Sequence, residues 1–109
     1  MSKEKTKLVL NQLVADLSQQ AAIIHQVHWY MRGRGFITLH PAMDKLMDEI
    51  NAQLDEVSER LIIIGGAPYS TLREFADNTK IQDIPASYER SIDEWVSHLL
   101  VGYEYLIGL

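Results

Sequence analysis

Residues 25–60 read HQVHWYMRGRGFITLHPAMDKLMDEINAQLDEVSER and hold three of the four histidines and the signals for a helical hairpin. The second part of this stretch repeats apolar residues at helical spacing, namely Leu39, Leu46, Ile50, Leu54, Val57 and Leu61. This spacing predicts a helix over residues 40–64, with Pro41 in the first turn, where its missing N–H costs nothing. Gly65 and Gly66 end that helix by supplying the left-handed position of a C-cap.

The residues before this helix predict an antiparallel partner for it. Apolar side chains recur in a 3-4 rhythm from Leu10 to Met31, which predicts a helix over residues 6–32. His28 continues the apolar stripe of that helix. Gly33 and Gly35 break the helix and allow the chain to reverse. The resulting hairpin would bring His28, just before the break, beside His40, just after it.

Four polar residues of the second helix share one stripe. At about 100° per residue, Asp44, Asp55 and Glu59 are turned from His40 by roughly 40°, 60° and 100°. His40 and Asp55 nevertheless lie on the order of 22 Å apart along the axis, whereas a metal ion reaches only about 2 Å to each ligand. Two copies of the helix, antiparallel about a two-fold axis, would bring the histidine end of each to the carboxylate end of the other. If all four residues bind one metal, the sequence predicts two equivalent shared sites in a homodimer.

Each of these residues also has a simpler interpretation. A histidine on an apolar face, such as His28, is more often a hydrogen-bonded core residue than a ligand. Asp55 and Glu59, taken alone, are typical of a solvated helix face. Trp29 and Tyr30 suit core or interface packing. The joint placement of two histidines across a turn, with carboxylates returning to the same stripe, favours the metal site.

Four blocks of the sequence carry a resemblance to a known family. They are HQVHWYMRG at residues 25–33, His40, LDEVSERL at residues 54–61 and GGAPYSTL at residues 65–72. In order and spacing they closely resemble the Dps family of mini-ferritins, in the type of the peroxide-resistance Dps proteins of Gram-positive bacteria. The resemblance runs from about Leu8 to the last residue. It implies an all-α, ferritin-like four-helix-bundle architecture, here two long antiparallel helices, a short connecting helix and a truncated third long helix.

The resemblance also implies the ligands and the reaction. In the family, the positions matching His28 and His40 bind iron from one subunit, and those matching Asp55 and Glu59 bind it from the two-fold partner. The position matching Asp44 lies close by. The implied protein is a ferroxidase, which binds Fe(II), passes its electrons to hydrogen peroxide and deposits ferric oxide without releasing hydroxyl radicals, and so protects against oxidative stress.

The chemistry of the residues agrees with this implication. A mixed set of imidazole and carboxylate ligands suits Fe(II), with Zn(II) and Mn(II) as competitors, and carboxylates favour Fe(III) over Fe(II) by charge. Asp44 is expected to be a second-site metal ligand or a group that orients water or His28. Trp29, next to a ligand, could intercept stray oxidising equivalents. His25 is a weaker candidate with an expected structural role.

The rest of the chain predicts one short and one longer helix. The pattern Thr71-Leu72-Arg73-Glu74 is a capping box, which predicts a helix over residues 72–77. Residues 78–85 suit a loop, and the last helix is expected to begin near Ala86 or Ser87. Its apolar stripe consists of Ile92, Trp95, Val96, Leu99, Leu100, Tyr103, Leu106 and Ile107. His98 lies off that stripe and is assigned no function.

The expected departure from the family lies at the C-terminus. Dps chains continue through a longer third helix and a fourth helix, which closes the bundle and lines the pores of a twelve-subunit cage. Residues 1–109 are therefore expected to form a single, C-terminally incomplete ferritin-like domain. Either the chain is truncated or another copy supplies the missing face. The missing helix puts the formation of a cage and the storage of iron in question, but every residue of the proposed metal site is present.

Composition and charge limit the kinds of partner and site that the chain can have. The absence of cysteine excludes disulfides and thiolate metal sites. The net charge of −5 argues against nucleic acid as the main partner. Lys3, Lys5 and Lys7 are a weak version of the lysine-rich tail with which some Dps proteins hold DNA, and a frayed, solvated terminus is favoured. No membrane span or signal peptide is predicted, so the expected compartment is the cytoplasm. Two alternatives to the ferroxidase stay open, a chain that dimerises without storing iron and a DNA-compacting protein.

Overall fold

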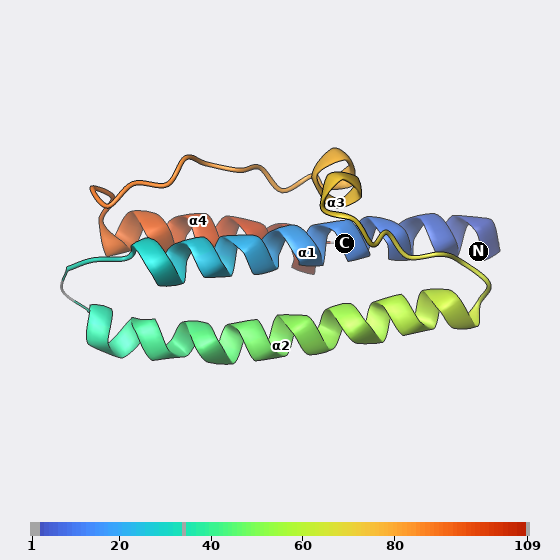
Figure 1. Cartoon of the computed structure of the whole chain (residues 1–109), viewed down its shortest axis with the longest axis horizontal. Helices are drawn as coiled ribbons and strands as arrows, with labels where there is room; N and C mark the ends of the chain where they lie inside the picture. The colour runs from blue at the N-terminus through green and yellow to red at the C-terminus, as the bar shows by residue number, and fades with distance from the viewer. Residues whose placement is uncertain (1–2, 34, 109) are drawn as a thin grey trace.

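The computed structural model describes residues 3–33 and 35–108, which form four helices joined by loops (Figure 1). The helices are α1 (Lys3–Tyr30), α2 (Phe36–Ile63), α3 (Leu72–Asn78) and α4 (Ile92–Ile107). The two long helices are antiparallel, and α3 and α4 both pack on α1. The described residues contain no strand, so the all-α prediction is confirmed. Met1 and Ser2 of the lysine-rich segment, Arg34 of the predicted hinge and Leu109 lie outside the described residues.

The turn between the long helices depends on two glycines, as predicted. Gly33 has φ 104° and Gly35 has φ 95°, values that residues with a Cβ rarely adopt. The reversal is complete so quickly that α2 begins at Phe36, four residues earlier than predicted. The placement of Pro41 in the first turn is therefore wrong, because Pro41 lies inside α2 and has no N–H for the carbonyl of Ile37. The side chain of Ile37 is 87% exposed, so this turn of the helix faces solvent.

The C-terminal ends of α1 and α2 are closed by different devices. The guanidinium of Arg32 donates to the carbonyls of Trp29 and Met31, at 3.0 and 2.8 Å, and α1 ends at Tyr30 instead of the predicted Arg32. At the end of α2, Gly65 has φ 89° and its N–H donates to Ile62. The N–H of Gly66 donates to Leu61, which completes the paired hydrogen bonds of a glycine C-cap and confirms the predicted end of this helix.

Capping boxes open both shorter helices. Thr71 and Glu74 exchange side-chain and backbone hydrogen bonds at the start of α3, as predicted, and α3 continues to Asn78. Ser91 and Glu94 form a second capping box that the sequence analysis did not use. It starts α4 at Ile92, so the expected start at Ala86 or Ser87 is wrong. The residues just before Ser91 form a turn that is held partly by the Arg90 guanidinium donating to the carbonyl of Pro85.

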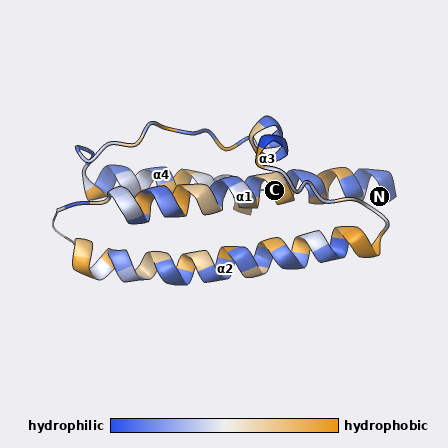
Figure 2. Ribbon diagram, in the orientation of Figure 1, coloured by the Kyte–Doolittle hydropathy of each residue, from blue (hydrophilic) through white to orange (hydrophobic). Residues whose placement is uncertain are grey.

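The hydrophobic core lies between α1, α2 and α4, and orange apolar segments recur along all three helices in Figure 2. Its buried members include Ile24, Val27, Ile50, Trp95 and Leu99. Of the predicted α4 stripe, Trp95, Leu99, Tyr103 and Leu106 belong to this core, whereas Ile92, Val96, Leu100 and Ile107 do not, and Ile107 is 84% exposed. No helix among the described residues has the length and apolarity that a membrane crossing requires.

The buried carboxylate of Asp16 in α1 accepts hydrogen bonds from the loop after α3 and from α4. Asp16 is fully buried and accepts hydrogen bonds from the Thr79 hydroxyl at 2.8 Å and from the Lys80 N–H at 2.9 Å. It also accepts from the Gln12 amide at 3.1 Å and the Tyr105 hydroxyl at 2.8 Å. Burial, followed by the hydrogen bond to Asp16, raises the pKa of Tyr105 to about 12. The extended segment that leads into α4 is thus held against α1 by a carboxylate with several donors.

Candidate metal centre

The glycine turn brings the two predicted histidine ligands together. The ring centroids of His28 and His40 lie 4.0 Å apart in an edge-to-face arrangement. His28 comes from the last turn of α1 and His40 from the second turn of α2, and both are half-buried. A pair of half-buried imidazoles at the end of a hairpin is a suitable half of a site for a divalent metal ion.

Two neighbours hold this histidine pair. Asp44 lies one turn after His40, and its Oδ1 is 3.8 Å from Nδ1 of His28, an ion pair when His28 is protonated. The ring of Phe36 lies 4.5 Å from that of His40, centroid to centroid. Sequence reasoning missed Phe36 because it placed the start of the helix too late. With the helix beginning at Phe36, the spacing of four residues to His40 would have put both rings on one face.

The predicted carboxylate ligands lie elsewhere on α2. Asp55 and Glu59 are exposed, and the unbroken helix separates Asp55 from His40 by about 22 Å along its axis. Within residues 3–33 and 35–108, no three histidine or acidic side chains of one copy are grouped so that they could hold a metal ion. One chain therefore brings His28 and His40 together, with Asp44 3.8 Å from His28, but it completes no metal site and leaves Asp55 and Glu59 apart from the histidines.

The aromatic residues beside His28 have different environments. Trp29 is 60% exposed, so its predicted packing into the core of one copy is wrong, and packing at an interface stays a prediction. Its ring stacks on His25 at 4.8 Å with an angle of 19° between the planes, which gives His25 a structural contact. Tyr30 packs against the core, 6.4 Å from buried Trp95, centroid to centroid.

Comparisons with known proteins show the family to which this fold belongs. Residues 8–109 match the ferritin-like domain family. The "DNA protection during starvation protein" of Streptococcus suis is 52% identical over 104 residues, which cover 95% of this chain. A structure of Dps from Listeria innocua soaked with zinc is 46% identical and matches 93% of this chain with a TM-score of 0.87. The chain belongs to the Dps family of ferritin-like proteins.

A further Dps structure bears on the histidines. It is a variant of the Listeria innocua protein in which two histidines, twelve positions apart, are replaced by glycine. It is 44% identical and matches 93% of this chain with a TM-score of 0.89. The present Dps chain spans 60% of the length of the Streptococcus suis relative, 67% of the zinc-soaked chain and 66% of the variant chain.

Proposed function

We propose that this Dps chain is a ferroxidase whose iron site is shared between two copies. His28 and His40 of one copy and Asp55 and Glu59 of the other bind Fe(II), and Asp44 lies beside His28 as a ligand of a second metal site or as the group that orients water or His28. The observation that carries the proposal is the hairpin end, where two half-buried imidazoles lie 4.0 Å apart with Asp44 next to them. The replaced histidines of the Listeria variant have the same separation in sequence as His28 and His40, which supports this choice.

The proposed reaction follows from the ligand set. Two Fe(II) ions give one electron each to hydrogen peroxide, its O–O bond breaks, and two hydroxide ions form without a free hydroxyl radical. Imidazoles bind Fe(II) well, and the added carboxylates favour the ferric product by charge. Exposed Trp29, one residue after His28, is placed to intercept an oxidising equivalent that escapes. Iron is the substrate, and Zn(II) or Mn(II) would compete for the same ligands.

A subunit-mixing experiment tests the shared site. One variant lacks the imidazoles (His28→Ala/His40→Ala) and the other lacks the acids (Asp55→Ala/Glu59→Ala). Each alone should oxidise Fe(II) with peroxide no faster than buffer does. After random exchange of subunits, each mixed dimer regains one complete site, so about a quarter of the wild-type rate should return. Native mass spectrometry establishes that mixed dimers have formed.

The matched control is Glu49→Ala/Glu56→Ala, which removes two exposed carboxylates of α2 that point away from the stripe. It should retain the wild-type rate. Mixed dimers without regained oxidation would rule out a site divided in this way. Full activity of either variant alone would show that those ligands are not needed.

DNA protection is a second candidate, favoured by the name of the Streptococcus suis relative. In the structure α1 is already helical at Lys3, and Lys3 and Lys5 are exposed, which agrees with the expected solvated terminus. Lys7 pairs with Glu4 at 3.1 Å, which lowers the charge that it can offer to phosphate. If the lysines bind DNA, a gel shift should appear at low salt and disappear in Lys3→Ala/Lys5→Ala/Lys7→Ala.

A further inference from the structure

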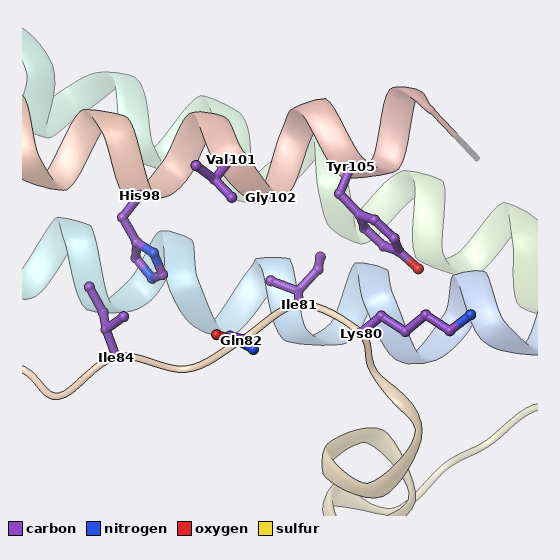
Figure 3. Close-up of a pocket in the computed structure, with 8 residues that line it drawn as sticks. All are labelled: Lys80, Ile81, Gln82, Ile84, His98, Val101, Gly102 and Tyr105. Atoms are coloured by element: carbon purple, nitrogen blue, oxygen red, sulfur yellow. The ribbon is translucent and has the colours of Figure 1, made fainter.

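A pocket of about 390 Å³ lies between residues 80–84 and α4, and none of the proposed metal ligands lines it (Figure 3). Sites for small molecules have volumes of about 300 to 1,000 Å³ and mostly apolar walls. Here Ile81, Ile84 and Val101 supply apolar wall. Gly102 also lines the pocket, and a Cβ at that position would collide with the amide of Gln20. The pocket therefore has the size and the wall chemistry of a small-molecule site.

One polar atom in this pocket lacks a partner. Figure 3 shows the His98 ring projecting from α4 toward the segment that carries Ile84. Its Nε2 is buried and makes no hydrogen bond with any residue that the structure describes. Burial lowers the pKa of His98, the positive charge of Arg90 lowers it further, and Asp83 opposes them. The imidazole is therefore neutral near pH 7, and its unsatisfied nitrogen is costly for the folded chain.

The hydroxyl of Tyr105 and the side chain of Lys80, which also line the pocket, are directed away from His98. The Tyr105 hydroxyl donates to Asp16 at 2.8 Å. The Lys80 N–H also donates to Asp16, and in Figure 3 the Lys80 side chain extends past Tyr105, away from His98. His98 is therefore the lining residue with a buried, unpaired polar side-chain atom, and the nearby guanidinium of Arg90 is already engaged with the carbonyl of Pro85.

We propose that this pocket binds a small uncharged molecule with an apolar body and one hydroxyl group, such as a phenol, whose hydroxyl pairs with Nε2 of His98. A hydroxyl both donates and accepts, so it satisfies this nitrogen in either tautomer of the neutral ring. A carboxylate would lose its hydration against Ile84 and Val101 and would be repelled by Asp83, while the guanidinium of Arg90 near His98 already donates to the carbonyl of Pro85. The binding is independent of the iron site.

The first test uses p-cresol as the probe and the whole chain as the protein. Titration should shift the His98 ring resonances in NMR spectra to saturation. Toluene has a similar apolar body without the hydroxyl, and it should bind about tenfold more weakly because one hydrogen bond is lost. The proposal is overturned if p-cresol causes no saturable shift of His98, or if the two probes bind equally well.

Variants locate the site. Val101→Trp should fill the pocket and abolish p-cresol binding, and Leu100→Trp is its matched control, since the two neighbours are 65% and 50% exposed and Leu100 does not line the pocket. His98→Phe keeps an aromatic ring and should reduce p-cresol affinity about tenfold, to that of toluene. Wild-type affinity in either Val101→Trp or His98→Phe would refute the assignment, and equal losses in both tryptophan variants would place the binding elsewhere.

Discussion

The polar residues at the two ends of α2 differ in how many contacts they make within one chain. Near the N-terminus of α2, His40 is half-buried and contacts His28 and Phe36 of the same chain. In its second half, Asp55 and Glu59 are exposed. A turn can bring neighbours in sequence together, but a straight helix keeps residues fifteen positions apart at a distance of about 22 Å. The hairpin of one chain can therefore preform only the histidine half of the proposed centre, and the proposal needs a second copy to supply the acids.

The largest expected effect comes from Ile50→Asp. Ile50 lies between the two ends of α2, so its replacement should disrupt the packing that positions both the histidines and the acids. Ile50 is 1% exposed, so the variant places an unpaired charge in the core and should cost about 3 kcal/mol or more of unfolding free energy. Urea denaturation measures this loss. Asn51→Asp, at the exposed neighbouring position, should change stability by no more than about 0.5 kcal/mol. Peroxide-driven oxidation by a proven Ile50→Asp monomer would contradict the shared site.

A smaller and more selective effect is expected when the glycines at the two ends of α2 are replaced by alanine. Gly35 has φ 95° and Gly65 has φ 89°, and a Cβ at either would make only ordinary contacts. Gly35→Ala and Gly65→Ala should therefore each cost roughly 1–2 kcal/mol through backbone strain alone. Only Gly35→Ala should also weaken Zn(II) binding, measured by calorimetry, because it alone shifts His40 relative to His28.

Gly108→Ala is the control for both variants, because Gly108 has φ −75° and the change should be nearly neutral. If Gly65→Ala lowers Zn(II) affinity as much as Gly35→Ala does, metal binding follows global stability and not the geometry of the hairpin end.

The smallest effect on metal binding is expected for Tyr105→Phe, because Tyr105 is remote from both ends of α2. The pKa of Tyr105 rises from 10.0 to about 12 in the folded chain, so folding favours the protonated phenol. Its contribution to stability is complete below pH 10 and is lost as the pH rises through about 12. The excess stability of wild type over Tyr105→Phe should therefore shrink between pH 10 and 12, as measured by denaturation at each pH. A difference that stays constant over this range would disprove the linkage, and Zn(II) affinity should not change.

The fold was largely predictable where local signals set it. The Gly33 and Gly35 turn, the Gly65 cap and the Thr71 capping box all depend on residues within a few positions of each other, and the structure confirms them. The start of α4 was misplaced although its Ser91–Glu94 capping box was visible in the sequence. The approach of His28 to His40 was predicted from the turn, whereas the contact of Phe36 required the true start of α2.

Helical periodicity and glycine turns, both readable in the sequence, place two histidines at one end of a hairpin and two acids about 22 and 28 Å away along the second helix. Only the tertiary structure decided that Trp95 is buried while Trp29 is 60% exposed, and that Asp16 bonds to residues more than sixty positions away. It alone made the pocket that leaves His98 without a partner. The physical reason is range, since caps and turns depend on neighbours along the chain, whereas burial depends on which distant segments pack together.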